Sequence, residues 1–378
     1  MLVIFDGVTA GGTRCVTGNL FVLPIYPSPM NLHRFGSSAI LALLFANPLS
    51  APSQSNPYRY IRVGNTNPAT ATPRPGFALM GGGEDLDPAF RWLCARAGGG
   101  DLLVLRSHGS DDYNPYIQKL CHLNSVATLV IPSRAAASDP FVAQKIREAS
   151  ALFISGGDQS EYINFWMNTP VQASLNEAIT RGVPIGGTSA GLAVLGEYAY
   201  SAQGDKPTDA DLDSRTAIAN PYGPRIALVH GFLAIPILHG IITDTHFATR
   251  NRMGRLLVFL ARLNEPGGKP LPPPGLNIRG LGVEQETAVL LDPDGAATVV
   301  GKGHAYFVGS RLASGVMIGG KFGVMPSKKP LTFGPYSVQR VAPRHTFNLK
   351  TWSGDSTAYT LRIESGSVHS TQPGGSQY

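Results

Sequence analysis

The sequence has few charged residues and very few cysteines. Only 15% of its 378 residues are Asp, Glu, Lys or Arg, whereas 43% are hydrophobic. A disordered chain shows the opposite balance, and Ala, Glu, Lys, Leu and Arg dominate a long coiled coil, so neither class fits. Three cysteines are too few for a scaffold held together by many disulfides. The chain is long enough for one large globular domain, or for one with a small addition.

The sequence also lacks any run of basic residues. Lys and Arg (31) exceed Asp and Glu (25) by only six charges in the whole chain. Proteins that bind nucleic acid usually concentrate their positive charge, so nucleic acid is a poor candidate partner, whereas a small acidic substrate stays open. What the chain has in abundance is Gly (44) and Pro (30), which indicate many tight turns.

Residues 1–51 resemble a leader segment. A short basic start at Met30 precedes the apolar run AILALLFA at 39–46, and small residues with proline follow. This is the arrangement of a secretory signal peptide, and the run is far shorter than the ~20 residues of a membrane span. We expect 30–51 to be a signal peptide, 1–29 to be a non-native upstream extension, and the protein to be secreted or periplasmic. The alternative is that the run is a buried segment of the fold.

Short apolar strands alternate with helices over most of the remaining chain. Such repeated β-α units predict a parallel sheet with helices on both faces, so we expect an α/β domain over 52–310. Weak alternation over 311–378 predicts a β-rich C-terminal extension. Asp85 and Asp139 are expected to cap helices. The expected strands are 77–80, 102–106, 126–131, 151–155, 183–185, 241–243, 280–283, 288–291, 297–300 and 305–308, and the expected helices include 85–97, 114–123, 139–149 and 249–263.

The segment GTSAG at 187–191 fits the pattern G-x-S-x-G between a predicted strand and an apolar helical run. A nucleophile on a sharp strand-to-helix turn needs neighbours without bulk, so Ser189 is the candidate nucleophile. The backbone N–H of Ala190, at the start of the helix, is a candidate oxyanion donor. The alternative is a glycine-rich turn with an ordinary serine.

A serine nucleophile needs a base, and His246 has the best context. It follows a strand end and precedes a helix, whereas His108, His230 and His239 have less context or apolar surroundings. A lone histidine is more often structural, but a well-placed serine favours the catalytic interpretation. The third triad member is sought in the polar loop 201–227, where spacing alone does not choose between Asp209, Asp211 and Asp213.

Two further groups belong to the candidate site. The turn at Gly156 and Gly157 follows another strand, and ligands bind at the carboxyl ends of strands in open α/β sheets. Gly157 is thus a second candidate oxyanion donor, and Gln159 is a candidate substrate contact. Three arginines follow His246 in the sequence: Arg250, Arg252 and Arg255. One or two of them can bind a substrate carboxylate, and the alternative is that they form a solvated basic face.

Four segments together resemble the cyanophycinases and their relatives, serine peptidases that include the aspartyl dipeptidases. They occur in the family's order and at about its spacing, and the resemblance covers roughly residues 76–310. Each motif alone is weak, but the joint match is specific. The segments are FISGGDQ (153–159), GGTSAG (186–191), ITDTHFATRNRMGRL (242–256) and GVEQETA (282–288).

The resemblance implies a flavodoxin-like sheet of the kind found in class I glutamine amidotransferases, with Ser189 as nucleophile and His246 as base. It puts the acidic member in the intervening loop, where Asp211 is our first choice and Asp209 the second. Thr245 replaces a family Gln, so the resemblance does not fix cyanophycin, a polyaspartate with arginine branches, as the substrate. The positions that match the family's substrate pocket are Gln159, Asp244, Thr245, Arg250, Arg252 and Arg255.

We therefore predict a serine peptidase that cleaves a peptide or isopeptide bond next to an aspartyl residue. No cofactor or metal is expected, nor a nucleic-acid partner or membrane contact after signal removal, and a homodimer stays open. The alternatives are an α/β-hydrolase esterase or lipase, a glutamine amidotransferase, which would use Cys at the elbow, and an inactive binding protein. Export would permit a Cys94–Cys121 disulfide, although two separate buried thiols fit equally well.

Overall fold

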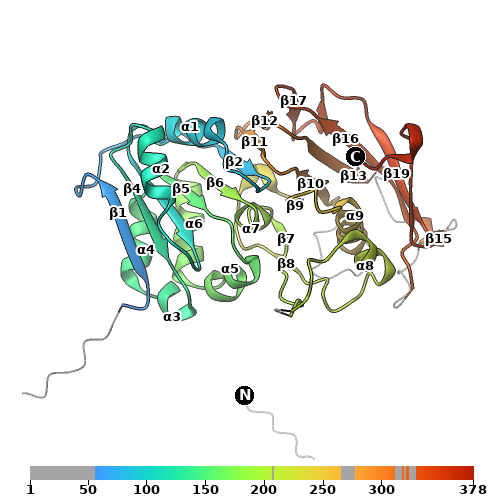
Figure 1. The fold of residues 1–378 in the computed structure, drawn as a ribbon, viewed down its shortest axis with the longest axis horizontal. Helices are drawn as coiled ribbons and strands as arrows, with labels where there is room; N and C mark the ends of the chain where they lie inside the picture. Colours follow the sequence, from blue (N-terminus) through green and yellow to red (C-terminus); the bar gives the residue numbers. More distant parts are fainter. Residues whose placement is uncertain (1–55, 207, 265–276, 311–316, 319–320, 323–328) are drawn as a thin grey trace, which may run out of the picture. The chain divides into compact units, whose positions relative to one another are not determined.

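The computed structural model describes residues 56–206, 208–264, 277–310, 317–318, 321–322 and 329–378 (Figure 1). The predicted upstream extension and signal peptide lie outside the described residues. Gln54–Tyr378 form one compact unit. The proposed division into 52–310 and 311–378 stays a prediction.

A ten-stranded sheet has five parallel strands at its centre, which confirms the expected parallel core. These strands run in the spatial order β4, β3, β5, β6, β2. Antiparallel strands extend both edges. The central strands are β2 (Phe77–Met80), β3 (Asp101–Arg106), β4 (Ser125–Val130), β5 (Ala151–Ile154) and β6 (Ile185–Thr188). The outer strands are β1 (Arg59–Gly64) on one side and β11 (Thr287–Leu291), β12 (Ala296–Gly301), β17 (Thr346–Asn348) and β18 (Ser353–Gly354) on the other.

The expected flavodoxin-like order holds for only part of this sheet. The strands β3, β4, β5 and β6 occupy the first four places of that order. The fifth place is taken by β2, which precedes the other four in the chain instead of following them. The fold is therefore a mixed α/β architecture with a parallel core.

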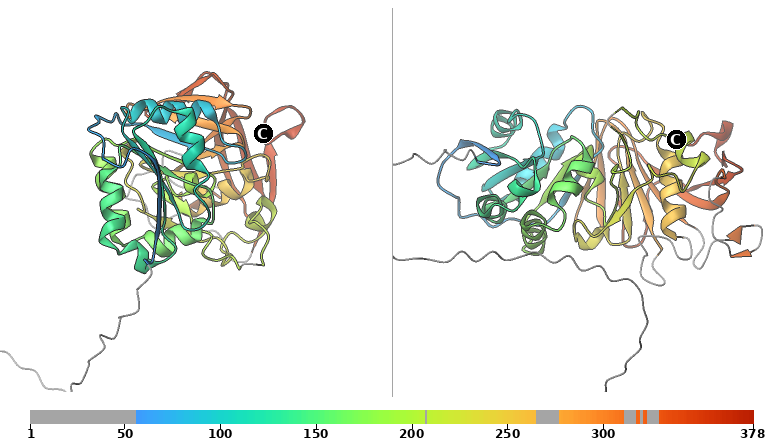
Figure 2. Two further views of the ribbon diagram at one scale, coloured as in Figure 1. Left: turned by 60° about the vertical axis from the view of Figure 1, so that its left-hand side comes forward. Right: turned by 90° about the horizontal axis from the view of Figure 1, so that it is seen from below.

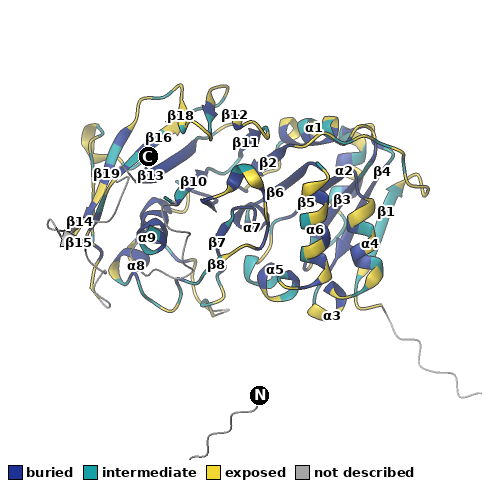
Figure 3. Cartoon of the chain, turned by 180° about the vertical axis from the view of Figure 1, so that it is seen from behind, coloured by how far each residue is buried: buried dark blue, intermediate teal, exposed yellow. Residues whose placement is uncertain are grey.

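Helices cover both faces of this sheet (Figure 2), and their outer sides are exposed (Figure 3). Alternating strand residues point to opposite faces, so Leu103 and Val104 enter different core clusters. Asp139 caps α4 as predicted and accepts from the Phe141 N–H at 2.8 Å. The Asp85 prediction is wrong, because the N-cap of α1 is Leu86 and has no side-chain cap. The helices are α1 (Asp87–Arg96) and α2 (Tyr113–Leu120) on one face, and α3 (Arg134–Ala137), α4 (Pro140–Glu148), α5 (Gln159–Trp166) and α6 (Pro170–Thr180) on the other.

A second, largely antiparallel sheet of eight strands follows the order β20, β19, β16, β13, β10, β9, β7, β8. Its strands β7, β9 and β10 are parallel neighbours. Ala305 and Phe307 face the first sheet's core, whereas Tyr306 and Val308 pack in the cluster around α9. The strands are β7 (Tyr198–Tyr200), β8 (Leu228–His230), β9 (Ile241–Asp244), β10 (Arg279–Val283), β13 (Ala305–Ser310), β16 (Phe333–Val341), β19 (Tyr359–Glu364) and β20 (Ser367–Ser370).

The β-rich character expected for the last part of the chain is confirmed, but its strands do not form a separate sheet. Residues 346–354 extend the first sheet, and residues 333–370 otherwise extend the second. The remaining elements are the pair β14 (Met317–Ile318) and β15 (Lys321–Phe322), the helices α7 (Ala190–Ala193), α8 (Ser214–Ala219) and α9 (Met253–Asn264), and the 3-10 turns η1 (Pro236–Leu238) and η2 (Pro373–Gly375).

Cys94 and Cys121 form a disulfide, which decides between the two sequence-based alternatives. The bond joins α1 to the residue that ends α2. None of the helices in the described part of the chain has the length and apolar character needed to cross a bilayer.

Candidate active site

Ser189 occupies a strained turn between β6 and α7, as the sequence predicted. Its backbone has φ 51° and ψ −119°, a conformation that residues other than glycine rarely adopt. The turn brings α7 so close to the first sheet that a Cβ on Gly191 would lie 2.0 Å from the Ile154 carbonyl oxygen. Glycine at 191 therefore permits the sharp turn that leaves the Ser189 side chain partly exposed.

His246 lies directly against this serine. It follows β9 of the second sheet, and its Nε2 atom is 2.7 Å from Ser189 Oγ. The His246 N–H donates to the carbonyl oxygen of Gly81, 2.8 Å away, in the turn after β2. The catalytic pair expected from the sequence thus meets where the two sheets adjoin.

The surroundings of His246 favour its neutral form. Burial, followed by the positive charges of Arg250 and Arg252, lowers its pKa to about 4 and outweighs the opposing effect of Asp211 and Asp244. At pH 7 the imidazole is therefore uncharged, as a base that must accept a proton from serine requires.

The partner of the other imidazole nitrogen is Gln285, which is not among the residues expected from the sequence. Its Nε2 atom is 2.8 Å from His246 Nδ1. In the parallel pair of β9 and β10, Gly282 is opposite Asp244, so the residues that follow the two strands become neighbours. The motif GVEQETA contained this position, and its place after a predicted strand was the available signal.

The amide group of Gln285 can act in two ways. With its nitrogen toward Nδ1 it donates a proton, which places the imidazole proton on Nε2 and makes His246 a donor to Ser189. A half-turn of the amide brings its oxygen to the same place, where it accepts from Nδ1–H and leaves Nε2 free to accept. Catalysis by His246 as base requires the second arrangement.

The three aspartates expected to complete the triad have other partners. Asp211 accepts from Arg250 Nη1 at 2.6 Å and from Arg252 Nη2 at 2.9 Å. Asp209 accepts from the Lys206 N–H, and Asp213 caps α8. None of the three hydrogen-bonds His246 in the described part of the chain, so the expected contact of Asp211 with His246 is not present.

Most of the expected substrate-pocket residues are buried behind His246. Arg255 binds both carboxylate oxygens of Asp244, and Arg252 donates to the carbonyl and hydroxyl oxygens of Thr245 at 2.9 and 3.1 Å. These four residues are 2%, 2%, 6% and 3% exposed, so their main contacts support the site from within. Arg250 is exposed and Gln159 partly exposed, so a substrate can reach both side chains, of which Arg250 is also paired with Asp211.

The expected oxyanion donors lie beside Ser189. Ala190 is the first residue of α7, so its N–H has no acceptor within the helix. A Cβ on Gly156 would be 3.5 Å from Ser189 Cβ, which puts the 156–157 turn next to the nucleophile. Tyr162 donates to the carbonyl oxygens of Ser155 and Gly156 at 3.0 and 3.1 Å and holds this turn. The roles of Gly157 and Ala190 as oxyanion donors stay predictions.

Gly82 fixes the position of the imidazole from the other side. It has φ 93°, and a Cβ there would lie 2.3 Å from His246 Cε1. We expect Gly82→Ala to lower kcat/KM on the order of 100-fold, because the methyl group pushes the ring away from Ser189. The matched control is Gly99→Ala, which has φ 78° but open space for the new methyl group. Equal activity of the two variants, measured at equal thermal stability, would show that Gly82 does not position His246.

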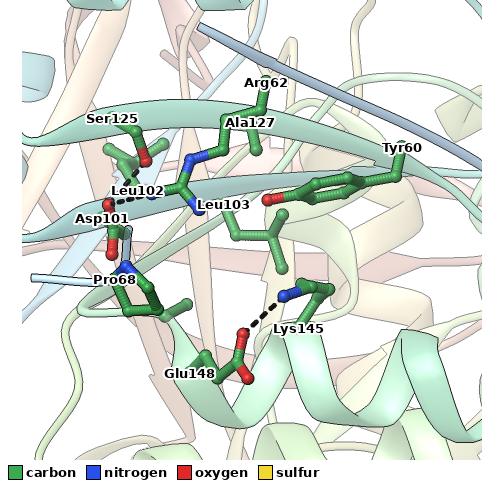
Figure 4. A pocket seen from close by; sticks show the side chains of 11 residues that line it. Tyr60, Arg62, Pro68, Asp101, Leu102, Leu103, Ser125, Ala127, Lys145 and Glu148 are labelled. Atoms are coloured by element: carbon green, nitrogen blue, oxygen red, sulfur yellow. Dashed lines mark hydrogen bonds and ion pairs between the residues drawn. The ribbon is translucent and has the colours of Figure 1, made fainter. Parts of the chain in front are cut away.

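Two of the cavities lie at opposite ends of the strands, one near their carboxyl ends and one near their amino ends. The first, of about 450 Å³, includes three carboxylates and two tyrosine rings; its lining is Asp85, Asp87, Arg106, Asp112, Tyr113 and Tyr116. The second, at the amino ends of β3 and β4, is about 20 Å³, room for one water (Figure 4). The ion pairs Arg62–Asp101 and Lys145–Glu148 are part of its wall, and it is too small for a ligand. No group of His, Cys, Asp and Glu suited to hold a metal ion occurs within the described ranges.

Known proteins are similar to this chain over part of its length. Residues 107–219, which include Ser189, match the profile of peptidase family S51. A cyanophycinase from Synechococcus elongatus is 26% identical over 246 residues, 62% of this chain and 68% of the relative. One from Geminocystis herdmanii is 28% identical over 189 residues, 49% of this chain and 59% of the relative.

Two solved structures are similar in part. A peptidase from an acI-B1 Actinobacterium has a TM-score of 0.46 at 16% identity, covering 73% of this chain and 97% of its own. A putative peptidase E from Listeria monocytogenes has a TM-score of 0.36 at 14% identity, covering 57% and 94%. The profile match and the curated relatives together show that the chain is similar to the serine peptidases of family S51 and distantly homologous to the cyanophycinases.

Proposed function

We propose that this peptidase hydrolyses a peptide or isopeptide bond next to an aspartyl residue, with Ser189 as nucleophile and His246 as base. The observation that carries the proposal is the 2.7 Å contact between Ser189 Oγ and His246 Nε2 on a strained strand-to-helix turn. The expected Asp211 is replaced in this scheme by Gln285, whose amide oxygen would hold the proton on Nδ1.

The reaction proceeds through an acyl-enzyme. His246 Nε2 takes the proton of the Ser189 hydroxyl while Oγ attacks the carbonyl carbon, and the N–H groups of Ala190 and Gly157 stabilise the resulting oxyanion. The imidazolium then returns the proton to the leaving amine as the C–N bond breaks. In the second half, His246 removes a proton from water, which attacks the ester and releases the acid and the serine hydroxyl.

The charges around the site support a substrate that carries an acidic residue. Arg250 is exposed and its backbone N–H donates to the His246 carbonyl oxygen at 2.9 Å, while its guanidinium donates to Asp211 at 2.6 Å. A substrate carboxylate is a suitable partner for it. The cavity with Asp85, Asp87 and Asp112 lies along the same edge of the first sheet and favours a positively charged branch, as in a cyanophycin-like polymer.

The test is incubation of the purified protein with cyanophycin, a β-aspartyl dipeptide panel and matched α-aspartyl and glutamyl peptides, with the products identified by mass. We expect cleavage only beside aspartyl residues and loss of all products in Ser189→Ala. Cleavage of simple esters without any peptide product would instead support the esterase alternative.

We also propose that the protein is exported to an oxidising compartment. The Cys94–Cys121 disulfide supports this, because such bonds persist mainly in secreted and periplasmic proteins. The check is the N-terminal residue of the natural protein, determined by mass spectrometry, together with its distribution between cell fractions. A reduced, cytoplasmic protein that still begins at Met1 would contradict export.

A further inference from the structure

The segment that carries the catalytic histidine is a series of turns, not a regular element. We call residues 246–252, between β9 and α9, the catalytic turn. His246 and Asn251 in it have φ of 46° and 48°, which residues other than glycine adopt only when their surroundings enforce it. Its internal backbone hydrogen bonds run from the Arg250 N–H to the His246 oxygen, from the Asn251 N–H to the Ala248 oxygen and from the Arg252 N–H to the Phe247 oxygen. Its position therefore depends on what packs against it.

Tyr378 closes the far end of the catalytic turn. Its hydroxyl accepts from the backbone N–H of Met253, the first residue of α9, at 2.9 Å. The same hydroxyl donates to the Asn251 side-chain oxygen at 3.1 Å. It thus satisfies one of the N–H groups that the start of a helix leaves without an intrahelical acceptor, and it binds the strained residue just before that helix.

The ring of Tyr378 contacts the residue next to the base. Phe247 is fully buried, and the Tyr378 and Phe247 rings meet edge to face with centroids 6.1 Å apart. Tyr378 also meets Tyr306 of β13 edge to face at 5.8 Å. On its other side Phe247 lies against β10, since a Cβ on Gly282 would be 2.6 Å from its ring. The Tyr378 ring therefore helps hold Phe247 against the second sheet.

Tyr378 is itself anchored at a distance from the site. The Tyr359 hydroxyl, on β19, donates to the carbonyl oxygen of Gln377 at 2.8 Å. The Gln372 side chain donates to the Ser376 carbonyl oxygen at 3.1 Å, which ties together the segment that follows β20. Figure 1 shows this end of the chain beside the second sheet, near β16. Through these contacts the segment connects the second sheet to the catalytic turn and can hold the turn in place relative to the sheet.

We propose that Tyr378 is a positioning residue for His246: through its hydroxyl on Asn251 and Met253 and its ring on Phe247, it sets the place of the imidazole relative to Ser189. The proposal rests on the proposed function, since it assigns Tyr378 a part in the same Ser189–His246 reaction. A residue 132 positions further along the chain would in this way belong to the active site without contacting the substrate.

The test compares Tyr378→Phe with Tyr336→Phe. Both variants remove one hydroxyl that hydrogen-bonds around α9, because Tyr336 donates to the Leu257 carbonyl oxygen at 2.7 Å, but only Tyr378 contacts the catalytic turn. We expect Tyr378→Phe to slow labelling of Ser189 by a fluorophosphonate probe, and kcat, on the order of tenfold with little change in KM. Tyr336→Phe, matched in thermal stability, should label at the wild-type rate, and Tyr378→Ala should label more slowly than Tyr378→Phe.

A second readout does not depend on catalysis. In protein with ¹³C-labelled histidine, the His246 signal is assigned by its loss in His246→Ala, and its titration is followed by NMR. We expect the pKa of His246 to rise in Tyr378→Phe and to stay unchanged in Tyr336→Phe, because displacement would expose the ring and change its distances from Arg250, Arg252, Asp211 and Asp244.

Equal labelling and equal His246 titration in the two variants would overturn the proposal and leave Tyr378 a structural residue. Failure of the proposed function has a different signature, because wild-type protein and Ser189→Ala would then both remain unlabelled, while the NMR comparison still decides the role of Tyr378.

Discussion

The Ser189→Ala protein is expected to fold normally and to lose turnover by about 10⁶-fold, the order found when the serine nucleophile of a triad is removed. The loss of one oxygen leaves the strained turn in place, because Ser189 holds it through its backbone, whose N–H donates to the Met80 carbonyl oxygen at 3.2 Å. Without Oγ there is no atom for His246 to deprotonate and no acyl-enzyme. The measurement is kcat/KM on the best peptide of the panel, together with the thermal unfolding midpoint.

The matched control for this variant is Ser174→Ala. Ser174 is a buried serine that lies on α6 and accepts from Arg147, away from Ser189 and His246. Its replacement should leave turnover within about twofold of the wild type, since it removes only one hydrogen bond. Residual activity of Ser189→Ala above a few per cent would assign the nucleophile to another residue.

Gln285→Leu is expected to lower kcat on the order of 100- to 1,000-fold with a small effect on KM. Leucine has a similar size but accepts no hydrogen bond, so nothing retains the proton on Nδ1, and an imidazole in the wrong tautomer cannot act as base. The measurement is kcat at saturating substrate over pH 4–9.

Gln285→Glu separates orientation from charge. A carboxylate accepts from Nδ1–H as an amide oxygen does, so this variant should keep much of the activity that leucine loses. Its negative charge also stabilises the imidazolium and raises the pKa of His246, which is about 4 in the wild type. Because the neutral imidazole is the active form, the acidic limb of the kcat/KM profile should move to higher pH. An unchanged limb, or full activity of Gln285→Leu, would show that Gln285 does not act on His246.

The pairing of Ser189 with His246 could be predicted because its signals are local. A short apolar strand, a glycine turn and a helical run occur within a few residues of Ser189, and the same kind of strand end precedes His246. Strand and helix formation in these stretches follows from residue type and spacing over one element, which a single sequence displays. The resemblance to cyanophycinases then indicated that the segments around Ser189 and His246 belong to one site, which their spacing in the sequence alone does not show.

The partner of His246 could not be predicted, because it depends on strand pairing. Asp211 was favoured as an acid in the loop between nucleophile and base, yet two arginines neutralise it, and the parallel register of β9 with β10 brings Gln285 to Nδ1 instead. A hydrogen bond forms only when strand pairing places donor and acceptor within about 3 Å of each other, and a suitable residue type elsewhere in the sequence does not ensure this.

The sequence by itself determined the α/β alternation, the serine turn between a strand and a helix, and the histidine that follows a strand. Each of these depends only on residues within one or two neighbouring elements of the chain. The tertiary structure alone decided that Arg252 and Arg255 support the site from inside, that the late strands divide between two sheets, and that Tyr378 reaches the catalytic turn. These features depend on how separate elements pack together, as in the contact between Met253 and Tyr378, 125 positions apart. The free energy of such contacts arises only when the sheets have brought the partners together.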